Sequence, residues 1–86
     1  MKSLLKNYID LLTTDKLKSF AIKNDINLTD NELDYILNLV KENYDDILVN
    51  EDKYLNDIKN KIKEEEFIKI SNLYTYYKNR YKGYLF

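Results

Sequence analysis

The sequence predicts a small all-α protein, a bundle of four to five short helices that forms a single domain over residues 1–86. A chain of 86 residues is enough for one domain with a thin core. It contains no proline and only one glycine, whereas compact β proteins need both at many turns. Leu, Ile, Val and Phe are frequent and the net charge is only −1, which favours a folded chain over a disordered one.

The first two helices are predicted from apolar spacing and capping residues. Residues 4–12 place a set of apolar side chains on one helical face: Leu4, Leu5, Tyr8, Ile9 and Leu12. A helix lying on a membrane surface would also have such a face, but this one is short and carries few basic residues, so a core helix is favoured. The second helix should begin after Thr13, a good N-cap, and end near Asn24 or Asp25, which tolerate the left-handed conformation.

The third helix has the clearest local signal. Thr29 and Glu32 form the Ser/Thr-x-x-Glu pattern of a capping box. An apolar stripe follows at helical spacing: Leu33, Ile36, Leu37, Val40, Tyr44, Ile47 and Leu48. Asp45 and Asp46 would oppose the helix dipole at its C-terminal end, so we expect a break near Asn43.

Tyr35 and Leu39 give the third helix a second apolar side. A helix that is apolar on two faces is either central in the fold or shared with a partner. The sequence leaves these two alternatives open.

Two further helices are predicted in the C-terminal half. Asn50 is a candidate N-cap, and a narrow stripe follows it at Leu55, Ile58 and Ile62. A second stripe begins at Phe67 and is rotated from the first by roughly a quarter turn, which predicts a break at Glu64–Glu66.

The stretch LYTYYKNRYKGYLF, residues 73–86, holds five of the nine tyrosines. Four of these five tyrosines continue the apolar stripe on one side of a helix, which is typical of a core. The stripe consists of Phe67, Ile70, Leu73, Tyr74, Tyr77, Tyr81 and Tyr84. Only Tyr76 falls off this stripe. The residues GYLF from Gly83 are expected to cap the helix and fold back as an apolar plug.

The same stretch also has features of a nucleic-acid surface. Residues 67–86 carry four basic residues and no acidic one: Lys69, Lys78, Arg80 and Lys82. Basic side chains neutralise phosphates, and aromatic rings stack on unpaired bases. These basic residues flank the apolar stripe, however, where long side chains commonly lie beside a packed seam.

Several classes of function are excluded by composition. The chain has no cysteine and no histidine, so zinc–thiolate sites, cysteine chemistry and histidine bases are absent. No glycine-rich phosphate loop occurs, and the acidic runs Asp45–Asp46 and Glu64–Glu66 are interpreted as solvated helix-end charge. We therefore expect no enzyme, cofactor, metal or small-molecule substrate. The sequence has no targeting signal and no membrane span, so a cytoplasmic location is expected.

The pattern from Thr13 to Val40 resembles the YqfT-like family of small, uncharacterised bacterial proteins. Thr-x-Asp-x-Leu, then Phe20-Ala21, then Ile26-x-Leu28-Thr29, precedes a capped amphipathic helix. The chain lacks the proline expected after the first cap and the glycine expected before Ile26. The resemblance implies a helical fold of unknown function and assigns no site residues.

The predicted function is a non-enzymatic protein-interaction module, such as an adaptor or small regulator, that binds a protein partner or itself. Candidate partner-binding residues are Tyr35, Leu39, Tyr76, Lys78, Arg80 and Lys82. The alternative is a single-stranded RNA or DNA binder that uses Tyr76, Lys78, Arg80 and Lys82. Binding that weakens steeply with salt would distinguish the alternative.

Overall fold

Five helices make up the part of the chain that the structure, a computed structural model, describes: residues 2–80, with side chains from residue 6. They are α1 (Lys2–Asp10), α2 (Thr14–Lys23), α3 (Asp30–Ile47), α4 (Glu51–Lys59) and α5 (Glu64–Arg80). Residues 2–80 contain no β-strand. The predicted fold class, a small all-α bundle, is therefore confirmed.

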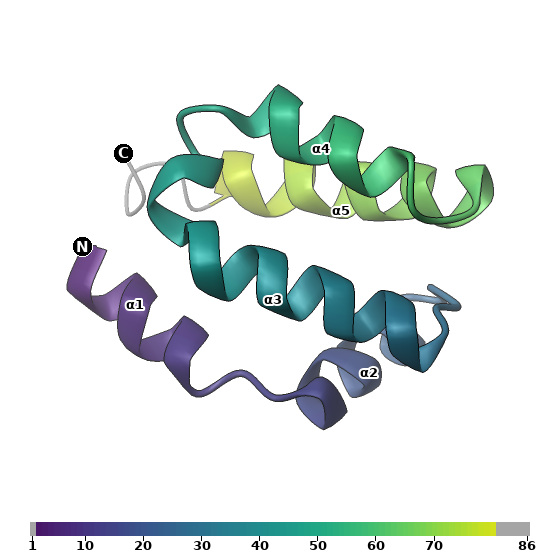
Figure 1. Cartoon of the computed structure of the whole chain (residues 1–86), viewed down its shortest axis with the longest axis horizontal. Helices are drawn as coiled ribbons and strands as arrows, with labels where there is room; N and C mark the ends of the chain where they lie inside the picture. Colours follow the sequence, from purple (N-terminus) through teal and green to yellow (C-terminus); the bar gives the residue numbers. More distant parts are fainter. Residues whose placement is uncertain (1, 81–86) are drawn as a thin grey trace.

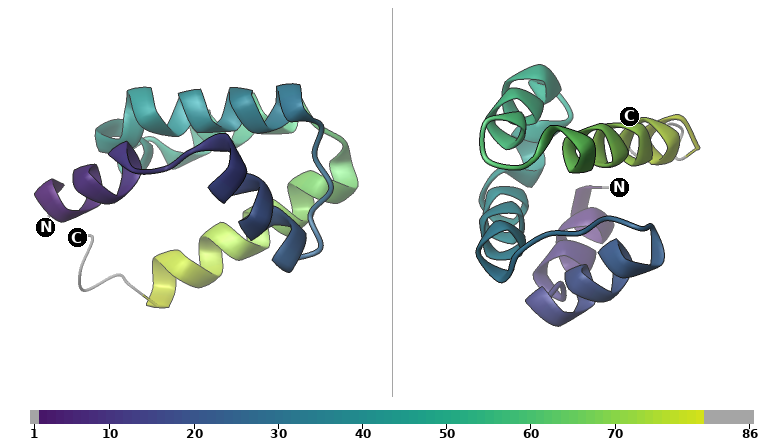
Figure 2. Two further views of the ribbon diagram at one scale, coloured as in Figure 1. Left: turned by 90° about the horizontal axis from the view of Figure 1, so that it is seen from below. Right: turned by 90° about the vertical axis from the view of Figure 1, so that its right-hand side faces the viewer.

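Helix α3 is central in the bundle (Figure 1). Helices α1 and α2 pack on one side of it, and α4 packs on the other. Helix α5 lies along α4. In the right-hand view of Figure 2, α5 and the α1–α2 pair project in the same direction from the side formed by α3 and α4. We call α5 and the α1–α2 pair the two arms of the molecule.

Two clusters of buried side chains form the core. The first contains Ala21, Ile26 and Leu33, which join α2 and its following connector to α3. The second contains Ile36, Ile58 and Ile62, which join α3 to α4 and the chain beyond it. Ile70 packs against both clusters, so α5 is attached to each of them.

The predicted N-caps of α2 and α3 are confirmed. The Thr13 hydroxyl accepts a hydrogen bond from the Lys16 amide at 3.2 Å. At α3, the Glu32 amide donates to the Thr29 hydroxyl at 3.1 Å, and the Thr29 amide donates to the Glu32 carboxylate at 2.8 Å. Asp25 has φ of 59°, so the left-handed residue predicted after α2 is also present.

Removing the Thr29 hydroxyl tests whether this N-cap stabilises the fold. Thr29→Ala should lower the free energy of unfolding by about 1 kcal/mol, because the Glu32 amide loses its acceptor. Urea unfolding followed by circular dichroism would measure the change. Thr29→Ser, which keeps the hydroxyl, should stay close to the wild type. A loss as large in Thr29→Ser as in Thr29→Ala would contradict the capping role.

The break predicted in the third helix is a kink at Asn43. Its backbone leaves the helical region, with φ of −130° and ψ of 16°, while the helix continues to Ile47. The Asn43 side chain donates to the Leu39 carbonyl, one turn back, at 2.8 Å.

The predicted break between the last two helices is confirmed, because α4 ends at Lys59 and α5 begins at Glu64. The capping role expected for the Asn50 side chain is wrong. Asn50 occupies the N-cap position of α4, but its side chain makes no capping hydrogen bond. Its amide group donates instead to the Asp46 carboxylate at 2.7 Å, because that acceptor lies one turn back on the preceding segment.

Candidate functional site

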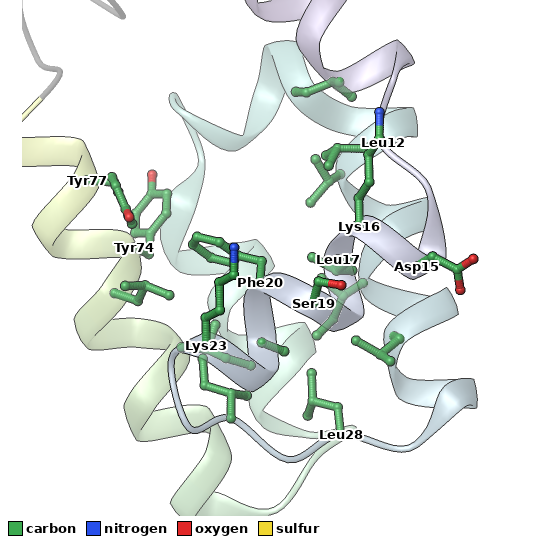
Figure 3. Close-up of a pocket in the computed structure, with 18 of the residues that line it drawn as sticks. Leu12, Asp15, Lys16, Leu17, Ser19, Phe20, Lys23, Leu28, Tyr74 and Tyr77 are labelled. Carbon is green, nitrogen blue, oxygen red and sulfur yellow. The ribbon is translucent and has the colours of Figure 1, made fainter.

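An apolar groove lies between the two arms of the described structure. It is an open cavity of about 910 Å³, and its floor is formed by α3. Its walls include side chains of α1 and the residues after it, of α2 and of α5: Tyr8, Leu11, Leu12, Phe20, Leu73 and Tyr77. We call this cavity the apolar groove. Figure 3 shows Phe20 of α2 facing Tyr74 and Tyr77 of α5 across it.

The groove leaves large apolar side chains open to solvent. Leu11 is 66% exposed and Tyr8 is 67% exposed, although both line the groove. The two walls approach each other at Phe20 and Tyr77, whose ring centroids lie 6.0 Å apart. Exposed apolar surface gathered in a concavity is typical of an interaction site.

Polar groups in the groove lining are concentrated on α2. Asp15, Lys16, Ser19 and Lys23 lie along the lining and are exposed. The Lys16 ammonium donates to the Leu11 carbonyl at 3.1 Å, which ties α2 to the segment after α1. Among the described residues, Lys23 makes no ion pair. The groove thus combines an apolar interior with positive charge at its edge.

One wall of the groove is held in place by a polar contact between α5 and α4. Tyr74 donates its hydroxyl proton to the Glu51 carboxylate at 2.8 Å, and Lys78 donates to the other oxygen at 2.7 Å. The Lys78 hydrogen bond is the main cause that lowers the pKa of Glu51, and burial raises the pKa of Tyr74. The contact fixes the Tyr74 ring against the groove.

The basic residues predicted to bind a partner are already engaged within the chain. Lys78 is half-buried and pairs with Glu51. Arg80 donates to the Tyr76 hydroxyl at 2.9 Å. Tyr76 is 54% exposed and does not line the groove, and its ring packs nearly perpendicular to that of Tyr77, with 5.2 Å between the ring centroids. Lys82 lies outside the described residues.

Tyr35 and Leu39, the other predicted partner-binding residues, lie away from the groove. Both are half-buried and pack against the cluster of Ile36, Ile58 and Ile62. The Lys61 ammonium lies 5.8 Å from the centre of the Tyr35 ring. The second apolar side of α3 is therefore covered largely by this chain, which fits the alternative of a central helix.

The predicted core stripe of α5 faces the rest of the molecule but is partly exposed to solvent. Phe67, Ile70, Leu73 and Tyr74 are half-buried, whereas Tyr77 is 37% exposed. Tyr81 and Tyr84 lie outside the described residues. The stripe remains open because its C-terminal part, at Leu73, Tyr74 and Tyr77, lines the groove that separates α5 from the α1–α2 arm.

Two acidic residues interpreted as solvated charge have structural partners instead. Glu66 is 6% exposed, and its carboxylate accepts from the Asn27 amide at 2.6 Å, which lowers its pKa. Asp46 accepts from the buried Tyr54 hydroxyl at 2.6 Å, and this contact raises the pKa of Tyr54 to about 12. The solvated interpretation is wrong for both residues, because Glu66 accepts from an amide 39 residues away and Asp46 accepts from a tyrosine eight residues along the chain.

The described residues contain no group of three acidic side chains placed to hold a metal ion. Within that same part of the chain, no helix has the length and apolar character needed to cross a membrane.

Comparisons with protein-family models, curated proteins and solved structures gave no match. The resemblance to the YqfT-like family therefore stays an interpretation of the sequence.

Proposed function

We propose that this protein is a non-enzymatic interaction module whose apolar groove binds an amphipathic helix of a partner protein. The observation that carries the proposal is the set of exposed apolar side chains gathered along the groove, led by Leu11 and Tyr8. Helix-in-groove recognition uses such a surface, into which the partner inserts apolar side chains spaced three and four residues apart.

The partner is expected to carry acidic residues beside its apolar face. Lys16 and Lys23 lie at the edge of the groove, against a single acidic lining residue, Asp15. Charged groups at the rim of an interface contribute mainly to specificity and to the rate of association. The apolar interior would supply most of the affinity, because buried anchors dominate most interfaces.

Catalysis is a weaker proposal for the same groove. Its lining contains one carboxylate, Asp15, and one serine, Ser19, and both are exposed. General acid–base or nucleophilic chemistry depends on a positioned base with a perturbed pKa. Among the described residues, the lowered carboxylate pKa values belong to Asp46, Glu51 and Glu66, none of which lines the groove.

A protein partner is also favoured over single-stranded nucleic acid. A nucleic-acid surface needs basic side chains that can turn toward phosphates. Lys78 is held by Glu51 at 2.7 Å, and the Arg80 guanidinium donates to Tyr76. Oligonucleotide binding at low salt that is lost in Tyr76→Ala would overturn this preference.

The groove proposal predicts that Leu11→Ser weakens partner binding at least tenfold. Leu11 is an exposed apolar lining residue, so its replacement removes a candidate anchor. Partners would be enriched from lysate with the tagged protein and identified, and the bound segment would be synthesised as a peptide. Its dissociation constant would then be measured by calorimetry for the wild type and for the variant.

Ile68→Ser is the matched control, because Ile68 is 51% exposed on α5 but does not line the groove. It should bind the peptide as tightly as the wild type. Equal weakening by both substitutions, or by neither, would contradict the groove as the binding site. Sedimentation of the protein alone would reveal self-association as a different use of the same surface.

A further inference from the structure

We propose that the C-terminal segment, residues 81–86 (YKGYLF), occupies the apolar groove within the same molecule when no partner is bound. The segment would then compete with the partner helix for one site. Only this competition depends on the proposed function, because the intramolecular contact can exist whether or not a partner does.

The end of α5 places the segment beside the groove. Helix α5 is described as far as Arg80, less than one turn beyond Tyr77, which lines the groove. The Tyr77 ring lies 6.0 Å from the Phe20 ring on the opposite wall. Six extended residues span up to about 20 Å. The segment is therefore long enough to reach α2 and the segment after α1.

The composition of the segment matches the lining of the groove. Four of its six residues are apolar or aromatic: Tyr81, Tyr84, Leu85 and Phe86. Gly83 is the only glycine in the chain, and it permits the backbone conformations that a reversal of direction requires. Lys82 can keep its ammonium in water while its stem lies on apolar surface. Burial of these side chains would also cover Leu11 and Tyr8.

Disulfide trapping tests this contact directly, because the natural chain contains no cysteine. Ser19→Cys places a thiol of nearly the same size as serine in the groove lining. It is combined with Leu85→Cys, and the disulfide is equilibrated in glutathione buffer to measure the effective concentration of the two thiols. We expect a value at least tenfold above that of the control pair, with the product a monomer.

The control pair is Asp52→Cys with Leu85→Cys. Asp52 follows Glu51, whose carboxylate lies 2.7 Å from the Lys78 ammonium, so it also lies near the end of α5. It does not line the groove. A segment that samples space freely would give both pairs similar effective concentrations. Circular dichroism of the reduced variants would establish that both are folded.

Equal effective concentrations in the two folded variants would overturn the proposal. A disulfide-linked dimer from the Ser19→Cys pair would also overturn it, because a second copy would then supply the segment. Failure of the proposed function would look different: trapping would succeed while Leu11→Ser left peptide binding unchanged.

Discussion

Leu33→Ala is expected to lower the free energy of unfolding by about 2–5 kcal/mol. Leu33 is 1% exposed and belongs to the cluster that joins α2 and α3. Its truncation removes buried apolar contacts and leaves a cavity that rigid helices refill only in part. A small domain has a total stability of about 5–15 kcal/mol, so this loss is a large part of it. Urea unfolding would measure the change.

The control is Ile22→Ala on α2, a helix that packs against α3. Ile22 is 65% exposed, so its truncation should change the free energy of unfolding by less than about 0.5 kcal/mol. Leu33 also lines the groove floor. A loss for Leu33→Ala no greater than that for Ile22→Ala would mean that the first core cluster is not packed as described.

The features that the sequence predicted well are local ones. The Thr29–Glu32 capping box depends on residues three apart, and the break expected near Asn43, which is present as a kink, is inferred from acidic residues near one helix end. The break before Glu64 could be found because two apolar stripes lie out of phase. Each of these signals is complete within a few turns of helix, so no knowledge of the tertiary arrangement was needed.

The features that the sequence missed depend on distant parts of the chain. Glu66 lies in an acidic run of the kind that begins many helices. Its carboxylate, however, accepts a hydrogen bond from the Asn27 amide, 39 positions away in the sequence. The groove depends on how far α5 lies from α2, and helical periodicity does not determine that distance. Tyr8 was correctly assigned to an apolar face, but this residue is 67% exposed and lines an open groove.

The burial of Glu66 suggests that this single carboxylate joins α5 to the connector between α2 and α3. It accepts from the Asn27 amide at 2.6 Å. Lys69, one turn further on, donates to the Asp25 carbonyl at 2.8 Å and lies 3.5 Å from the Glu66 carboxylate. These contacts hold the start of α5 close to the end of α2. They therefore limit the width of the groove at that end.

Glu66→Ala is expected to lower Tm at neutral pH by about 10 °C, because hydrogen bonds to a charged group are among the strong ones. The Asn27 amide hydrogen bond is the main cause that lowers the pKa of Glu66 below its ordinary 4.5. The carboxylate therefore stabilises the fold fully above about pH 4.5. This stabilisation is lost as the pH falls through the lower, folded pKa. The Tm of the wild type should thus fall more steeply on acidification than that of the variant.

Glu65→Ala is the matched control, since Glu65 occupies the same first turn of α5 and is exposed. Both substitutions remove one negative charge near the positive end of the helix dipole, so that contribution cancels in the comparison. Glu65→Ala should therefore keep most of the wild-type Tm and most of its steep loss below pH 4.5. Calorimetric scans between pH 3 and pH 7 would measure both quantities. Matching acid profiles for Glu66→Ala and Glu65→Ala would mean that the Glu66 carboxylate does not join α5 to the connector.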